Sequence, residues 1–201
     1  MADEAPDLNA RVAARVRELR TARGLSLDSL ATRSGVSRSM ISLVERGESS
    51  PTAVLLEKLA SALDVTLASL FDIPPSAEPP AGPLARRKEQ PEWRDPGSGY
   101  VRRNVSPPGA PQPMRIVDVR FPAGARVAFD NAARDATEAP LHQQVWVLQG
   151  SMDVTVGDER HRLREGDCLA MRLHHPTVFH NPTRTSARYA VVIETETRRS
   201  R

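Results

Sequence analysis

Four side chains with hydrogen-bonding chemistry recur at helical spacing in a short segment of this sequence. Arg38, Ser39, Ser42 and Arg46 fall on one face of a predicted helix, and apolar residues of the same segment fall on the other. A guanidinium group donates forked hydrogen bonds to a phosphate or to the major-groove edge of guanine, and a serine hydroxyl reaches either target. The residue types and their spacing therefore indicate a surface that binds nucleic acid.

Residues 25–47 predict the elements that position these side chains, namely a helix, a tight turn and a second helix. Ser26 and Ser37 are predicted N-caps, because each precedes an apolar-periodic run. Gly35 lies where the chain must turn with a positive φ, and Gly47 follows the end of the second helix. A short helix packed across another, with arginine and small polar side chains at its outer N-terminal end, has the shape that enters a DNA major groove.

The rest of the chain divides by composition into an α plus all-β, two-domain organisation. Helical periodicity over residues 9–72 predicts five short helices in one bundle. Eleven of the 17 prolines lie in residues 74–113, and we expect a linker at 73–90. From about residue 114 the apolar period becomes two, which predicts an antiparallel sandwich or barrel within a second domain over 91–196.

The charge distribution places a limit on how the helical region would hold DNA. The chain has a net charge of +3, but residues 1–72 contain nine basic and ten acidic residues. Affinity for phosphate must therefore come from a local patch, for which Arg33, Arg38 and Arg46 are the candidates.

No apolar run approaches the roughly 20 residues of a membrane span, and the acidic N-terminus has no apolar core of a secretory signal. We therefore expect a cytoplasmic protein without a membrane partner. The single cysteine, Cys168, lies in the apolar run DCLAMRL, and we expect it to be buried and inert.

The N-terminal region resembles the Cro/CI-type helix-turn-helix domain of the XRE family over residues 13–71. The resemblance rests on three segments in family order: RELRTARGLSLDSLA, SGVSRSMISLVERGESSPT and LEKLASALDVTLASLF. It implies a five-helix, lambda-repressor-like bundle whose helix 37–46 reads double-stranded DNA at an operator. The residues expected to contact DNA are Arg33, Ser37, Arg38, Ser39, Ser42, Leu43 and Arg46.

The C-terminal region resembles a cupin, a small antiparallel β-barrel, over residues 112–194. The resemblance rests on VWVLQGSMDVTV and REGDCLAMRLHHPTVFHN. The pairing of the two domains resembles the cupin-bearing XRE regulators of bacteria, in which the second domain dimerises and is thought to sense a small molecule. It implies a homodimeric transcriptional regulator with a possible small-molecule effector, and not an enzyme.

This sequence departs from the metal-binding cupin pattern at every usual ligand. The glutamate position is Gln143, the second-motif histidine position is Thr177, and the HxH positions fall near 137–139 without a histidine. We therefore expect no metal and no cofactor, and a ligand pocket with Gln143, Thr177 and Asn181 as its polar residues. An atypical metal site at His142, His175 or His180 is the alternative.

Two other functions are compatible with this sequence. One is a metal-dependent cupin enzyme with an appended DNA-binding head, which stoichiometric iron, manganese or zinc in the purified protein would favour. The other is a helical module that binds protein, which an absence of salt-dependent DNA binding would favour.

Overall fold

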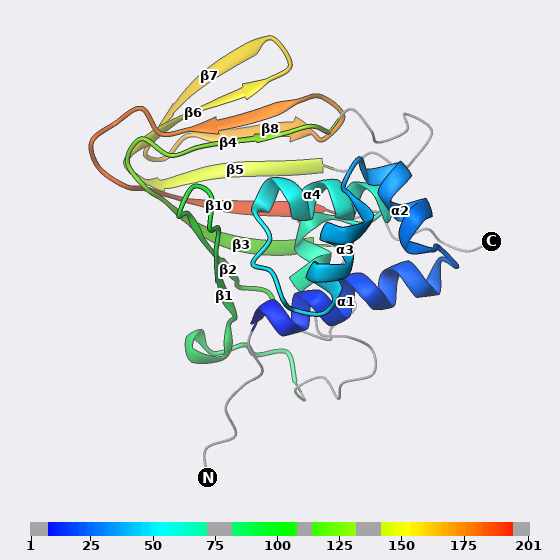
Figure 1. Cartoon of the computed structure of the whole chain (residues 1–201). Helices are drawn as coiled ribbons and strands as arrows, with labels where there is room; N and C mark the ends of the chain where they lie inside the picture. The colour runs from blue at the N-terminus through cyan, green and yellow to red at the C-terminus, as the bar shows by residue number, and fades with distance from the viewer. Residues whose placement is uncertain (1–7, 72–81, 108–113, 132–141, 195–201) are drawn as a thin grey trace, which may run out of the picture. The chain divides into compact units, whose positions relative to one another are not determined.

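The computed structural model describes residues 8–71, 82–107, 114–131 and 142–194 (Figure 1). The chain divides into two compact units, Met1–Gly82 and Pro83–Arg201. The division falls within the segment 73–90 in which we expected a linker, and residues 73–81 of that segment lie outside the described residues. No helix in the described part of the chain is both long enough and apolar enough to cross a membrane.

The first unit contains four α-helices among its described residues, and the expectation of five is wrong. The helices are α1 (Leu8–Ala22), α2 (Leu27–Ser34), α3 (Arg38–Glu45) and α4 (Ala53–Ala62). The expected fifth helix is a single 3-10 turn, η1 (Leu67–Phe71), which Thr66 begins by accepting a hydrogen bond from the Ser69 N–H. Five residues are too few for a stable α-helix, so the segment takes the tighter turn that is common in short connections.

The predicted caps and turn of the helical unit are confirmed. Ser26, Ser37 and Thr52 begin α2, α3 and α4, and each accepts a hydrogen bond from the backbone N–H three residues later. Gly35 ends α2 with φ +66°, a conformation that costs a side-chain-bearing residue free energy. The helices bury one common apolar core, whose least exposed members are Val12, Val16, Leu30, Ile41, Val44, Leu56, Leu59, Leu63 and Leu70.

The second unit is built from ten antiparallel strands among its described residues, preceded by a short 3-10 turn, η2 (Arg87–Glu89). The strands are β1 (Glu92–Arg94), β2 (Val101–Asn104), β3 (Met114–Phe121), β4 (Arg126–Phe129), β5 (His142–Gln149), β6 (Ser151–Val156), β7 (Glu159–Arg164), β8 (Cys168–Arg172), β9 (Thr177–His180) and β10 (Ala187–Glu194). They form a six-stranded sheet, β1-β2-β3-β10-β5-β8, and a four-stranded sheet, β4-β9-β6-β7.

The antiparallel domain is confirmed, but the closed barrel is wrong for the residues that the structure describes. Each sheet keeps two edges, and no described strand pairs with a strand of the other sheet. The β6–β7 hairpin turns at Gly157 (φ +57°), as the Gly157-Asp158 pair predicts.

The position of strand β8 explains why Cys168 and its cross-strand neighbour Trp146 are exposed, although the surrounding sequence is apolar. It is the outer strand of the six-stranded sheet, and only Met171 of its residues is buried. Cys168 is exposed, so the expected buried thiol is wrong. Its cross-strand partner Trp146 is 50% exposed, because both residues lie on the face that points away from the four-stranded sheet.

Aromatic rings form a continuous chain through the second unit. Trp93, Tyr100, Phe121, Tyr189, Phe179 and Phe129 follow one another with ring centroids 5.9–6.1 Å apart. Such distances are typical of favourable aromatic pairs. Burial raises the pKa of Tyr100 to about 12, so this ring stays neutral in its apolar surroundings. The chain connects β1 with β4, and therefore one sheet with the other.

Candidate nucleic-acid interface

Helix α3 is held in place by apolar contacts on its inner face and by an N-cap at its start. Ile41 is fully buried and Val44 is 1% exposed, while Ser39 is exposed. The Ser37 hydroxyl accepts a hydrogen bond from the Met40 N–H at 3.3 Å. The helix therefore has one anchored face and one face open to a partner, as the sequence predicted.

The open face of α3 is hollowed where α2 begins. Leu27 of α2 and Arg38, Ser39 and Ser42 of α3 line a hollow of about 450 Å³. Three of the seven predicted DNA-contacting residues thus meet around one depression, and Leu27 supplies an apolar wall. Leu27 was not among the predicted contact residues.

The three predicted contact arginines are each paired with a carboxylate. The pairs are Arg33–Asp64 at 3.2 Å, Arg38–Asp28 at 3.3 Å and Arg46–Glu48 at 2.8 Å. All six side chains are exposed by 41–75%. Exposed pairs of this kind exchange partners at a cost of about 1 kcal/mol or less, so a phosphate can displace the carboxylate. Nothing in the sequence indicates these pairs, except that Glu48 follows Arg46 by two residues.

Arg46 is the most strongly engaged of the three. Its Nε and Nη2 atoms donate to the two Glu48 carboxylate oxygens, both at 2.8 Å, and its Nη1 donates to the Ser42 hydroxyl. These hydrogen bonds raise the pKa of Arg46, and the same hydrogen bonds lower the pKa of Glu48. Glu48 therefore stays ionised at neutral pH and competes with any phosphate for this guanidinium group.

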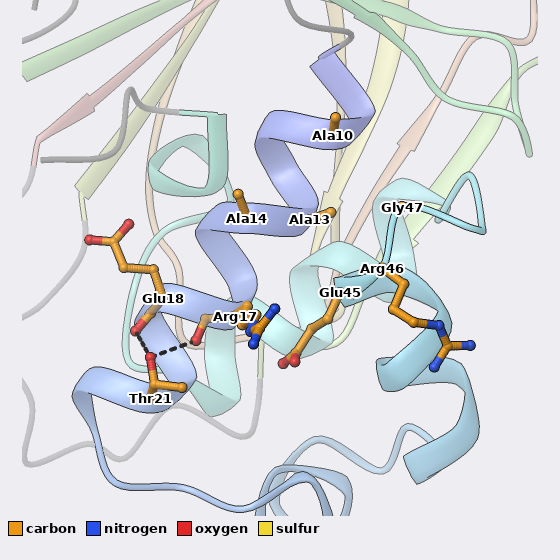
Figure 2. Close-up of a pocket in the computed structure, with 9 residues that line it drawn as sticks. All are labelled: Ala10, Ala13, Ala14, Arg17, Glu18, Thr21, Glu45, Arg46 and Gly47. Carbon is orange, nitrogen blue, oxygen red and sulfur yellow. Dashed lines mark hydrogen bonds between the residues drawn. The ribbon is translucent and has the colours of Figure 1, made fainter. Parts of the chain in front are cut away.

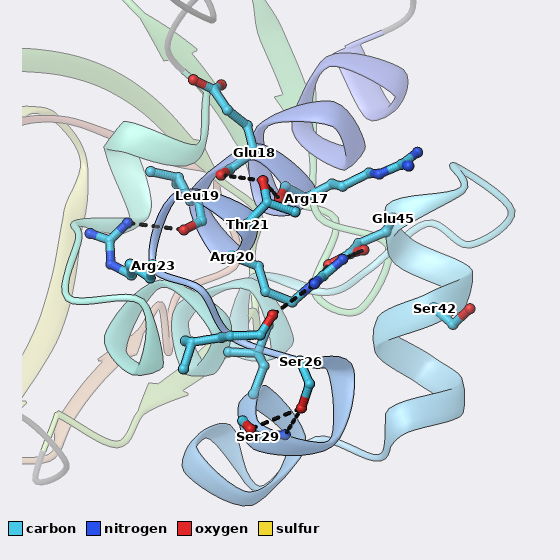
Figure 3. Close-up of polar contacts among 12 residues, drawn as sticks. Arg17, Glu18, Leu19, Arg20, Thr21, Arg23, Ser26, Ser29, Ser42 and Glu45 are labelled. Atoms are coloured by element: carbon cyan, nitrogen blue, oxygen red, sulfur yellow. Dashed lines mark hydrogen bonds and ion pairs between the residues drawn. The ribbon is translucent and has the colours of Figure 1, made fainter.

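The orientation of α3 is fixed by a buried ion pair between its last residue and α1. Arg20 donates from Nε and Nη2 to the Glu45 carboxylate at 2.6 and 2.9 Å, and from Nη1 to the Leu25 carbonyl at 2.8 Å (Figure 3). The two side chains are only 14% and 7% exposed. The hydrogen bonds to Glu45 raise the pKa of Arg20, against the opposing effect of burial. Glu45 therefore has a structural role in this unit.

A second hollow, of about 400 Å³, lies between α1 and the end of α3 (Figure 2). Its lining residues are Ala10, Ala13, Ala14, Arg17, Glu18, Thr21, Glu45, Arg46 and Gly47. Thr21 turns its hydroxyl back to the carbonyls of Arg17 and Glu18. Glu45 and Arg46 both line this hollow, but Figure 2 shows that their side chains point in different directions, that of Glu45 toward α1 and that of Arg46 away from it.

In the second unit, the predicted pocket residues differ in how fully they are bonded. Asn181 is fully buried, and its amide nitrogen donates to the carbonyls of Phe121, Pro122 and Thr185 at 2.9–3.2 Å. Its amide oxygen accepts from the Thr183 N–H and hydroxyl. Asn181 is thus bonded on all sides, both within its own loop and to the end of β3.

Thr177 and Gln143 lie on different sheets. The Thr177 hydroxyl donates to the His175 carbonyl at 3.1 Å and accepts from the Asn131 amide at 3.1 Å. Gln143 is 8% exposed on β5, and its side chain has no hydrogen bond to another described residue. Of the three, Gln143 alone therefore has hydrogen-bonding capacity free for a ligand within the part of the chain described.

The histidines give no metal cluster within the described residues. His142 lies on β5, His180 on β9, and the rings of His174 and His175 pack against each other at 3.9 Å. No three His, Cys, Asp or Glu side chains in the described ranges converge as a metal site would require. The positions 137–139, where the cupin pattern places its HxH histidines, lie outside the described residues.

The capped two-helix arrangement with an anchored, outward-facing α3 is the geometry of helix-turn-helix DNA-binding proteins. The helix-turn-helix family model HTH_3 matches residues 16–70. The HTH-type transcriptional regulator SutR of Escherichia coli is 44% identical over 64 residues, which are 32% of this chain and 36% of SutR. The uncharacterised HTH-type transcriptional regulator y4dJ of Sinorhizobium fredii is 36% identical over 76 residues, which are 38% of this chain and 96% of y4dJ. The chain belongs to this helix-turn-helix (XRE-type) family of transcriptional regulators.

The likeness extends to the second unit at the level of the fold. The crystal structure of an HTH_3 family transcriptional regulator from Vibrio cholerae superposes with a TM-score of 0.72, at 23% identity, over 94% of this chain and 98% of that chain. This chain spans between 36% and 53% of the lengths of the first three curated relatives it matches. The matched part of those relatives is the helix-turn-helix region, so the role of the second unit does not follow from them.

Proposed function

We propose that the chain binds an operator in double-stranded DNA through α3, as a homodimer, and that its sheet unit is a cupin-like dimerisation and effector domain. The observation that carries the DNA contact is the hollow formed by Leu27, Arg38, Ser39 and Ser42 on the open face of an anchored helix. Arg33 of α2, Ser37 at the N-cap of α3, Leu43 of α3 and Arg46 at its C-cap complete the proposed contact set.

A dimer is proposed because one reading helix covers too little of the major groove to select a site. Two heads related by a two-fold axis read two half-sites about 34 Å apart, which multiplies the selectivity of each. The proposed effector site lies between the sheets at Gln143, with Thr177 and Asn181 shaping its surroundings. An effector acts only if it favours one arrangement of the two heads over another.

Selection of genomic fragments by the purified full-length protein tests the proposed operator binding. We expect a two-fold symmetric site that is bound far more tightly than random DNA at physiological salt. Equal, weak binding to all fragments would contradict the proposal. Metal analysis of the same preparation separates it from the metal-dependent cupin enzyme, which requires a stoichiometric metal.

Arg38→Ala should weaken binding to the selected site by about 1–3 kcal/mol if the guanidinium group reads a base. The physical reason is the loss of a forked pair of donors to guanine. Titrations with operator and with random DNA at two salt concentrations check the effect. A loss of equal size on both DNAs would instead make Arg38 a phosphate contact.

Glu48→Gln should strengthen DNA binding about two- to fivefold at low salt, because the carboxylate no longer competes with phosphate for Arg46. The matched control is Glu165→Gln, which removes one exposed negative charge from the other unit. Binding titrations of both variants provide the measurement. An affinity equal to that of the control would show that Arg46 does not exchange Glu48 for DNA.

A further inference from the structure

Basic side chains from three strands lie on the outer face of the four-stranded sheet. Strand register places Arg126, His180, Asp153 and Arg162 in one row across β4, β9, β6 and β7. Directly paired residues of an antiparallel sheet lie on the same face, and residues two apart on a strand do so as well. Arg126, Arg160, Arg162, Arg164 and His180 thus share one face, which we call the basic face.

Little negative charge on these strands balances the basic face. Among the described residues of β4, β6, β7 and β9, its one carboxylate is Asp153, which is 3% exposed and held by Arg160 at 2.6 Å. Arg126, Arg162 and Arg164 are exposed and make no ion pair with a described residue. The face therefore presents at least three unneutralised guanidinium groups to its surroundings.

The outer face of the six-stranded sheet differs in this respect. Two of its exposed arginines are neutralised by neighbours on the same sheet, since Arg120 pairs with Glu92 at 3.0 Å and Arg188 pairs with Asp118 at 2.8 Å. Arg94 and Arg172 have no described carboxylate partner, but they lie on β1 and β8, the two opposite edge strands of this sheet, and so do not form a cluster. The basic face is thus a local property of one sheet and not a result of composition alone.

The spacing of the basic face suits a linear polyanion. Arg160, Arg162 and Arg164 recur along β7 about every 6.8 Å, and the row from β7 to β4 is about 14 Å wide at ordinary strand spacing. One DNA strand carries a phosphate for about every 3.4 Å of helix axis. The three arginines on β7 alone therefore span about four phosphates of one DNA strand.

We propose that the basic face is a second DNA-binding surface, which contacts backbone phosphates beside the operator. The inference rests on the proposed operator binding. The helical unit supplies little positive charge of its own, because residues 1–72 are net negative and all three contact arginines are paired with carboxylates. The ten residues 72–81 span at most about 36 Å, so binding of α3 keeps the sheet unit near the duplex.

The variant Arg126→Gln/Arg162→Gln/Arg164→Gln tests the inference in the full-length protein. Arg160 is kept because Asp153 would otherwise lose its partner. Dissociation constants are measured against salt on a duplex that extends two helical turns beyond the operator on each side. Each phosphate contact contributes about 0.9 to the slope of log K against log salt, so the slope should fall by about two to three in magnitude. The control is Arg172→Gln/Arg184→Gln, which removes exposed arginines elsewhere on the sheet unit and should change the slope little.

The outcomes separate this inference from the operator binding on which it rests. If the unmodified protein shows no site-specific binding, the proposed operator function fails. If it binds specifically but the triple variant keeps its salt slope, the basic face does not touch DNA and the inference is overturned. An equal fall in slope for the control also overturns it, because bulk charge then explains the effect. If the triple variant keeps its salt slope but no longer binds polyglutamate, used as a probe for acidic protein, the basic face binds an acidic protein partner and not DNA.

Discussion

Glu45→Ala should lower the free energy of unfolding of the helical unit by about 3 kcal/mol, because it leaves Arg20 buried without its partner. Both side chains lie at the contact of α1 with α3, where the hydrogen bonds between them are partly buried. Denaturant unfolding followed by far-ultraviolet circular dichroism measures the effect. Glu48→Ala is the matched control, since it breaks an exposed pair and should change stability little.

The double replacement Arg20→Met/Glu45→Leu tests the cause of the lost stability. The cause is either the removal of the ion pair or the presence of Arg20 without its carboxylate partner. Replacing both partners by apolar residues of similar size is often close to neutral, so the double variant should be more stable than Glu45→Ala alone. A double variant as unstable as the single one would mean that the charge pair itself holds α3. In either case DNA affinity should fall with Glu45→Ala, because the orientation of α3 depends on this contact.

Asn181→Ala should destabilise the sheet unit by about 3 kcal/mol, because it leaves buried backbone groups without partners. The amide of Asn181 donates to three carbonyls and accepts from Thr183, and both Asn181 and Phe121, one of the residues whose carbonyl it binds, are buried. Thermal unfolding in the absence of any ligand is the measurement.

Gln143→Leu is the informative comparison for the same region. Gln143 is buried without a described side-chain hydrogen bond, so an apolar replacement should leave stability unchanged or raise it. Replacement of a residue that is kept for ligand binding leaves stability unchanged or raises it. Replacement of a residue that supports the fold lowers stability, as we expect for Asn181. Unchanged stability of Asn181→Ala would contradict the structural role and favour a ligand contact for Asn181 as well.

The local features of the helical unit could be predicted because they depend on adjacent residues. Ser26, Ser37 and Gly35 act within one turn of their own position, and each is found as predicted. The Arg20–Glu45 pair joins residues 25 apart, and a single sequence does not indicate which arginine a glutamate meets. The carboxylates that pair with Arg33 and Arg38 escaped prediction for the same reason, since Asp64 belongs to the turn after α4 and Asp28 belongs to another helix than Arg38.

Predictions for the sheet unit failed where burial depends on the position of a strand in its sheet. The apolar run DCLAMRL predicts that Cys168 is buried. It forms an edge strand, so Cys168 is open to solvent, and its neighbour Trp146 is half-exposed. Alternating apolar residues predicted the strands but not whether the sheets close, because closure depends on pairings between distant segments.

The chain of aromatic rings gives the protein a built-in optical reporter. Trp93 stands at one end of it and is 5% exposed, while Trp146 is 50% exposed and does not belong to it. Close packing means that one ring displaced between the sheets moves its neighbours in turn. A compound that enters beside Phe179 should therefore change the emission of Trp93 and not that of Trp146. Acrylamide quenching separates the two tryptophans, so screening for an effector needs no added label.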